Sequence, residues 1–320
     1  MKQLSILILV ALVAVLAGCS KDDAVNTPVT DDQAIQEMVV SDESVSDFSQ
    51  SEETTISDDE EFEWSKYGFD ETMTQVKVFR WGRRVVSVDR NVTVMYVGDT
   101  LAVALLTKML NGNLVIAASY SDTAHLPDTL IRKPFHERLQ RKIVFARIGT
   151  YDNPRQNWKA VAISLVEGGI VPDTLNKFDI ESLAFISSSD TATITDPLNT
   201  WLRFGAQRDR VPIVHRGDSI LIRMTLTSAD DSAEAVVIRW TGESTNNDVI
   251  ARMRMRLVST TGGPGAYERV YEMKIRAHLR LGRPFGRFNV VTDVHSWGTL
   301  NDDAQPVSNR LWGFPYDVRP

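Results

Sequence analysis

From Trp64 to the C-terminus, apolar and polar residues alternate in short runs that turn residues separate. Side chains of an extended strand point alternately to opposite faces, so this period of two predicts half-buried β-strands. The pattern predicts twelve strands, at 76–81, 85–97, 100–108, 113–120, 142–148, 160–166, 178–186, 219–227, 235–241, 250–258, 268–280 and 287–294. The one helix expected here is short and covers 134–140. Many short strands with almost no helix favour an all-β fold of antiparallel β-sandwiches.

A nine-residue pattern occurs twice, at 97–105 and at 216–224. Each copy is a Gly-Asp turn, then Thr or Ser, then an alternating strand, and the offset of 119 residues is about one sandwich domain. The pattern resembles the strands entered through Gly-Asp in immunoglobulin-like and fibronectin-like domains, and this resemblance implies the fold and no function. We predict two tandem immunoglobulin-like domains, over 64–189 and 190–320.

Opposite charges divide the chain into a tail and a body. Residues 20–63 hold 15 acidic residues and one basic residue, whereas residues 64–320 carry a net charge of +6. A segment with so much charge and so little apolar surface does not fold alone, so we predict a disordered acidic tether over 19–63. The exception is Thr30-Asp31-Asp32-Gln33, a capping box before Ile35, Met38 and Val39. It predicts a helix of about two turns that forms only if its apolar side chains dock.

The first residues indicate a targeting signal. Residues 4–16 form a nearly unbroken apolar run, and thirteen helical residues span roughly 20 Å, too short for a bilayer core of about 30 Å. The run therefore fits a signal peptide over 1–18 better than a membrane span. It is followed by Leu16-Ala17-Gly18-Cys19, and Cys19 is the only cysteine in the chain.

This tetrapeptide resembles the lipobox of bacterial lipoproteins. The resemblance implies that a dedicated peptidase cuts before Cys19, that Cys19 carries acyl chains such as palmitate, and that these hold the protein on a membrane. Ser20 is not the aspartate that keeps enteric lipoproteins in the inner membrane, so the resemblance implies the outer membrane of a Gram-negative bacterium, facing the surface or the periplasm. The alternative is an ordinary cleaved signal in which Cys19 has no special role.

A row of basic residues is the most distinctive surface feature. They alternate with apolar residues on either side of a Gly-rich turn, so a hairpin would bring them to one solvent face. The members of this candidate anion-binding face are Arg252, Arg254, Arg256, Lys274, Arg276 and Arg280. An acidic polysaccharide or an envelope protein is the partner expected for it, and a solvated sheet face that binds nothing is the alternative. No nucleic-acid partner is expected.

Three of the seven tryptophans lie in loop-like contexts: Trp158, Trp297 and Trp312. Exposed tryptophans can stack on sugar rings, so these residues are candidates for a carbohydrate platform. The alternative is that the rings fill the ends of the sandwich core, because a large ring gains much from burial.

Other chemistry finds little support in the residues. A single cysteine excludes a disulfide framework, and the five histidines lack zinc-like spacing. Neither a nucleophile elbow nor a Gly-rich phosphate loop occurs, so no catalytic residue, metal site or cofactor is expected. Arg216-Gly217-Asp218 is interpreted as a turn. We therefore expect a lipid-anchored, non-enzymatic binding or structural module of the cell envelope. A polysaccharide-binding or polysaccharide-processing component of an envelope complex is the alternative.

Overall fold

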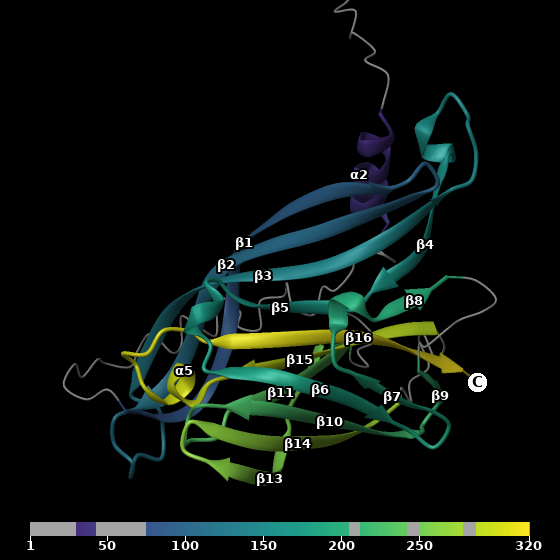
Figure 1. Cartoon of the computed structure of the whole chain (residues 1–320). Helices are drawn as coiled ribbons and strands as arrows, with labels where there is room; N and C mark the ends of the chain where they lie inside the picture. The colour runs from purple at the N-terminus through teal and green to yellow at the C-terminus, as the bar shows by residue number, and fades with distance from the viewer. Residues whose placement is uncertain (1–29, 43–74, 205–211, 242–249, 278–285, 320) are drawn as a thin grey trace, which may run out of the picture.

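The computed structural model describes residues 30–42, 75–204, 212–241, 250–277 and 286–319, and its strands form two antiparallel sheets (Figure 1). Eight strands of the larger, eleven-stranded sheet follow the order β1-β2-β3-β5-β16-β15-β11-β12, with β4, β8 and β9 beside this row. Among the described strands, only the three-residue pairing of β9 with β16 is parallel. The bounds are β1 (Lys77–Val97), β2 (Leu101–Ser119), β3 (Thr129–Arg147), β4 (Trp158–Ser164), β5 (Val166–Ile170), β8 (Trp201–Arg203), β9 (Ile213–His215), β11 (Ala235–Thr241), β12 (Ile250–Arg254), β15 (Gly286–His295) and β16 (Asn309–Arg319).

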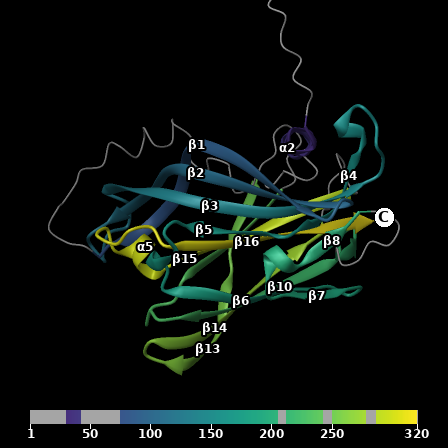
Figure 2. The ribbon, with the colours of Figure 1, turned by 45° about the horizontal axis from the view of Figure 1, so that its top comes forward.

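The smaller sheet has the order β13-β14-β10-β6-β7 and lies against the larger one (Figure 2). Its strands are β6 (Phe178–Ile186), β7 (Thr191–Ile194), β10 (Ser219–Ser228), β13 (Arg256–Gly263) and β14 (Ala266–Arg276). The described helices are α2 (Asp31–Ser41) and α5 (Trp297–Asn301), with 3-10 turns η2 (Pro154–Gln156), η3 (Asp173–Leu175) and η4 (Pro197–Asn199). The all-β sandwich class expected from the alternation is confirmed.

The core between the sheets follows from the period of two. In β10, every second side chain is buried, and the inward set is Ile220, Ile222, Met224 and Leu226. Burial of each such side chain contributes roughly 1.5–3 kcal/mol. Across the interface, the Phe185 ring of the small sheet meets the Phe314 ring of the large sheet edge-on, with centroids 5.6 Å apart. These contacts join the two sheets in one continuous apolar core.

Both sheets draw strands from either side of the boundary predicted at 189/190. β6 precedes that point and pairs with β10, and β5 likewise pairs with β16. The boundary is therefore not a break between sheets. The repeated nine-residue pattern reflects a repeated turn: Gly98 and Gly217 have φ of 66° and 82° and lead into β2 and β10, which lie in different sheets. Glycine adopts such positive φ angles without steric cost.

The helix expected over 134–140 is wrong, because these residues lie inside β3. The inward positions of β3 include Lys133, Glu137 and Arg141, which are charged and nevertheless buried. Polar residues on the buried face hide the alternation that marks a strand. The missing N–H of Pro134 is tolerated because β3 pairs with β5 only from Glu137 onward, so at Pro134 it pairs with β2 alone.

The capping-box helix is confirmed as α2. Thr30 Oγ1 accepts a hydrogen bond from the Gln33 backbone N–H, and Gln33 Oε1 accepts one from the Thr30 N–H. Ile35 and Val39 are fully buried against the body, and Met38 packs beside them. Residues 30–42 of the predicted tether are therefore docked, while the rest of 19–63 lies outside the described residues.

Gly112 in β2 provides the first test. A Cβ added there would lie 2.2 Å from the Arg84 carbonyl oxygen and 2.6 Å from the Phe135 ring. We expect Gly112→Ala to lower the free energy of unfolding by about 1–3 kcal/mol, because crowding forces neighbours off their preferred positions. Urea denaturation measures the loss. Gly263→Ala is the control, since nothing lies within 4 Å of its added Cβ. Equal stabilities of the two variants would contradict the close packing of Phe135 on Gly112.

Candidate functional site

A cluster of charged side chains lies inside the curve of the large sheet. Arg83 comes from β1, Glu137 from β3, Arg239 from β11, and Asp293 and His295 from β15. All five side chains are buried. β1 and β15 are separated by β2, β3, β5 and β16 in the sheet, so the sheet must curl for these side chains to meet. The α5 region closes the same end, since the Val76 N–H donates to the Asn301 carbonyl oxygen.

Two ion pairs form the centre of this cluster. The Arg83 guanidinium donates to Glu137 Oε2, and the Arg239 guanidinium donates to Asp293 Oδ2. Arg83 Nη1 also lies 3.9 Å from Asp293 Oδ2, so the two pairs are adjacent. The Asn309 amide on β16 joins both, donating to Glu137 Oε1 at 2.6 Å and to Asp293 Oδ1 at 3.3 Å.

Two guanidinium groups face two carboxylates in this cluster, and His295 Nε2 lies 3.2 Å from Asp293 Oδ2. Aromatic rings also pack on this cluster. The Phe135 ring centroid lies 4.7 Å from the Arg83 guanidinium carbon, and the Trp81 ring meets the His295 ring edge-on with centroids 4.7 Å apart. A buried charge is tolerated only when it is paired and hydrogen-bonded. This chemistry joins β1, β3, β11, β15 and β16 rigidly, and we call the group the ionic cluster.

A further buried ion pair, outside the ionic cluster, fixes the crossing from the small sheet to the large one. Arg269 on β14 donates to Glu234 Oε1 at 2.7 Å and to the carbonyl oxygens of Asp230, Asp231 and Ser232. These residues form the connection between β10 and β11. The Tyr271 hydroxyl donates to Glu234 Oε2 at 2.9 Å, and burial together with this carboxylate raises the tyrosine pKa.

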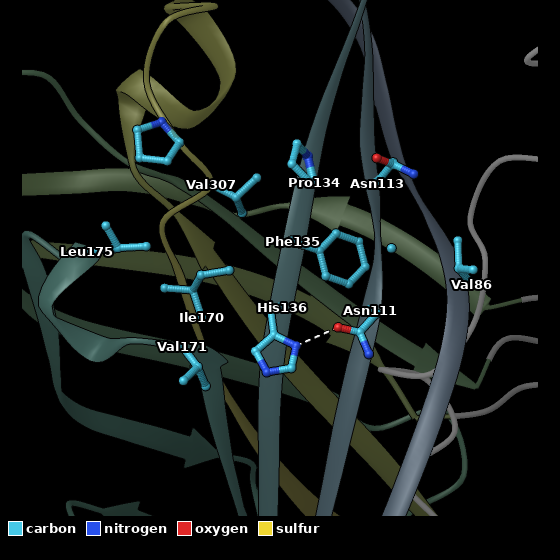
Figure 3. Close-up of a pocket in the computed structure, with 12 residues that line it drawn as sticks. Val86, Asn111, Asn113, Pro134, Phe135, His136, Ile170, Val171, Leu175 and Val307 are labelled. Atoms are coloured by element: carbon cyan, nitrogen blue, oxygen red, sulfur yellow. Dashed lines mark hydrogen bonds between the residues drawn. The ribbon is translucent and has the colours of Figure 1, made fainter.

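Phe135 also forms part of the wall of a hollow of about 520 Å³ (Figure 3). Its walls are mostly apolar, and its lining includes Val86, Phe135, Ile170, Leu175 and Val307. Its polar lining includes Asn111 and His136: His136 Nδ1 donates to Asn111 Oδ1 at 2.5 Å, and Asn111 Nδ2 donates to Ser87 Oγ on β1 at 3.2 Å. The hollow suits a small, mostly apolar ligand.

Lys133 on β3 joins this strand to the α5 region, which precedes Val307 of the hollow's lining. Its Nζ donates to the carbonyl oxygens of Gly298, Thr299 and Asp302 and so ties β3 to α5. Burial lowers the pKa of Lys133 to about 8, and the carboxylates of Asp302 and Asp303 oppose that shift. The lysine is thus a positioning group for the chain that carries Val307.

The predicted basic face is divided between the two sheets. The expected strand over 250–258 breaks at Met255, which is buried, so Arg254 lies on β12 of the large sheet and Arg256 on β13 of the small one. In the hairpin of β13 and β14, Gly263 pairs with Ala266 across a two-residue turn, and Arg256 faces Glu272. The side chain of Arg252 and all of Arg280 lie outside the described part of the chain.

Lys274 and Arg276 do lie on the outer face of the small sheet, as expected, next to β10. That face carries acids as well, and Arg223 of β10 forms an ion pair with Glu272 at 2.6 Å. The charged side chains on this face are Arg223, Arg256, Lys274 and Arg276 together with Asp179, Glu181, Glu268 and Glu272. The described cations there are therefore matched by carboxylates.

The candidate tryptophans do not form a surface platform. Trp158 and Trp312 are buried, and Trp297 is half-buried at the start of α5. The Trp158 ring lies beside Tyr96, with centroids 5.8 Å apart, and 5.6 Å from the Arg147 guanidinium carbon. Trp312 lies in β16, a strand that the sequence pattern did not indicate. The interpretation as core residues agrees with this placement.

Other features considered in the sequence are Cys19, the Arg-Gly-Asp tripeptide, metal sites and membrane-spanning helices. Cys19 lies outside the described residues. Arg216-Gly217-Asp218 is a turn, as expected, in which Asp218 Oδ2 accepts from the His215 N–H at 2.9 Å. No described group of three or more His, Cys, Asp or Glu side chains is arranged to hold a metal ion. Among the described residues, no helix has both the length and the apolar character needed to cross a bilayer.

Sequence reasoning missed the ionic cluster and the hollow. One signal was present: Lys133, Glu137 and Arg141 recur every four residues, and in a strand this spacing puts all three on one face. The helix expected over 134–140 lies within the same segment, and in a helix a spacing of four also gives one face. A search against models of protein families found no match to this chain, and a search of curated proteins also found none.

The ionic cluster predicts a large cost for losing one carboxylate. We expect Asp293→Ala to lower the free energy of unfolding by about 3–5 kcal/mol, because Arg239 is then buried without its counter-ion. Asp173→Ala is the control: its ion pair with Arg138 is exposed, and such pairs contribute at most about 1 kcal/mol. Urea denaturation compares the variants, and similar losses for both would show that the interior pair is not the stabilising element.

Trp158 offers a test between core and platform. We expect Trp158→Ala to lower the free energy of unfolding by about 3–5 kcal/mol, the usual cost of removing a large buried ring. Trp297→Ala should cost clearly less, since that ring is half-buried. Thermal unfolding followed by circular dichroism ranks the two. A Trp158→Ala protein as stable as the parent would contradict its place in the core.

Proposed function

We propose that this protein is a lipoprotein of a Gram-negative outer membrane, anchored through acylated Cys19, whose β-sandwich body acts as a non-enzymatic binding or structural module. The supporting motif is Leu16-Ala17-Gly18-Cys19, which follows the apolar run at the distance that a lipobox requires. Acyl chains on one cysteine provide a lasting anchor without a membrane-spanning helix.

The observation that carries the proposal is the docking of α2. This helix begins only twelve residues after Cys19, and polar contacts fasten it to the body. The Tyr96 hydroxyl donates to Asp32 at 2.5 Å, and the Gln36 amide donates to the Val92 carbonyl oxygen at 3.2 Å. Burial and the Asp32 carboxylate raise the pKa of Tyr96, so this donor keeps its proton.

Ion pairs fasten the other side of the helix. Arg147 lies 3.5 Å from Asp31, and Arg155 of η2 lies 3.7 Å from Glu37. Because α2 is held by the large sheet as well as by η2, a membrane anchor upstream of it would hold the whole body at a defined end. A segment that served only as a flexible linker would not need these contacts with the body.

The body supports a binding or structural role through its rigidity. Its buried charges serve the fold, since the ionic cluster and the Arg269–Glu234 pair join strands to one another. The hollow above Phe135 offers a preformed position for a small ligand. The alternative of a polysaccharide platform finds no support in Trp158 and Trp312, because both are buried.

The anchor predicts the behaviour of one substitution. We expect Cys19→Ala to move the protein from the membrane fraction to the soluble fraction, or to leave an unprocessed precursor, because the acyl chains then have no attachment point. Cell fractionation with a carbonate wash, followed by mass spectrometry of the N-terminus, measures both outcomes. Ser20→Ala is the matched control and should stay acylated and membrane-bound. A Cys19→Ala protein that is processed normally and remains with washed membranes would overturn the proposal.

A further inference from the structure

One end of the large sheet carries an apolar outer face. At the turn between β1 and β2, Val97 pairs with Leu101, which pairs with Ala146 of β3. One row further, Met95 pairs with Val103, which pairs with Val144. Ile148 follows directly after β3. These seven residues are the apolar tip: Met95, Val97, Leu101, Val103, Val144, Ala146 and Ile148.

Four side chains of the apolar tip, Met95, Val97, Leu101 and Ile148, are exposed, and the other three are half-buried. Val97 is 57% exposed and Ile148 is 59% exposed. Tyr151 in the following loop is exposed as well, and tyrosine favours the boundary between water and lipid. Isolated exposed apolar residues are ordinary, whereas a contiguous group marks an interaction surface.

The apolar character is strongest at this end. The next row along the same outer face is Thr93, Leu105 and Lys142, and the row after it, Asn91, Thr107 and Gln140, is wholly polar. In the row beyond that, Met109 lies between Asp89 and Arg138. A sheet face whose apolar residues concentrate in its last rows is suited to contact an apolar partner at its end rather than along its side.

The path of α2 indicates which partner the apolar tip can contact. The first turn of the helix lies at the apolar tip, where Asp32 contacts Tyr96 and Asp31 contacts Arg147, the neighbour of Ile148. Further along the helix, Gln36 reaches Val92, which is further from the turn. The chain therefore enters α2 at the apolar tip. In Figure 1, this tip lies at the upper ends of β1 and β2.

The distance to Cys19 is short. Thr30 is eleven positions after Cys19, and a fully extended chain of that length reaches at most about 40 Å. Acyl chains on Cys19 would thus hold the apolar tip close to the lipid surface.

We propose that the apolar tip docks on this lipid surface, an inference that rests on the proposed anchoring at Cys19. Asp99 at the apex of the turn favours zwitterionic headgroups, whose ammonium groups can meet a carboxylate, over an anionic surface.

The test uses the full-length protein, isolated from bacterial membranes and reconstituted in vesicles of phosphatidylethanolamine and phosphatidylcholine. Ile148→Cys and Leu126→Cys each receive a maleimide fluorophore, and iodide in the buffer quenches the exposed probe. Leu126 is the matched position, because it is 73% exposed and lies in the β2–β3 loop, at the opposite end of the strands. We expect severalfold weaker quenching at position 148 than at 126. Adding Val97→Asp and Leu101→Asp should abolish the difference while the protein stays with the vesicles.

The outcomes separate this inference from the anchor. Cys19 is the only native cysteine, so labelling of the unsubstituted protein would reveal a free thiol and overturn the anchoring. An unlabelled parent with equal quenching at 148 and 126 would leave the anchor intact and overturn the docking of the apolar tip. Protection at 148 that disappears when the protein is diluted in lipid would show that a second copy covers the apolar tip, which also overturns the proposal.

Discussion

The carboxylate of Asp293 is the interaction on which the curvature of the large sheet depends. It accepts from Arg239 and lies within 4 Å of Arg83, and these arginines come from strands near opposite ends of the sheet. Neither guanidinium could be withdrawn from water without carboxylates to receive it. The sheet must therefore curl until β1 faces β15, and only then do all four charges find partners. Apolar packing alone would fill the interior, but it would not fix which strands meet there.

Much of the fold follows from the alternation of side chains, because the sandwich core is built from strands such as β10 that alternate strictly. The prediction failed where burial and polarity do not coincide. β3 buries Lys133, Glu137 and Arg141, so the alternation indicated a strand only at its C-terminal end, over 142–148. β16 failed for the opposite reason: it is buried along nearly its whole length, and a continuous apolar run has no period of two.

The candidate sites show the same limit. Alternation placed Lys274 and Arg276 correctly on an outer face, because that inference needs only the strand itself. It could not show that the chain leaves one sheet and joins the other at Met255, since both halves alternate equally well. The partners across a strand depend on register, which the two-residue turn sets. For this reason Glu272 opposite Arg256, and the pairing of Arg223 with that same acid, were outside the reach of the sequence.

The position of α2 has a consequence for the solubility of the fold. β1 is the last strand of its row, so within the described part of the chain one side of its backbone has no neighbouring strand. Such an edge is a template on which another chain can add a strand, and proteins commonly block it. α2 lies against this strand, and its Gln36 amide occupies the carbonyl oxygen of Val92. The segment that would link a lipid anchor to the body is thus also a guard against intermolecular strand pairing. If the protein is anchored as we propose, its attachment to the membrane and its protection from aggregation would depend on the same three turns of helix.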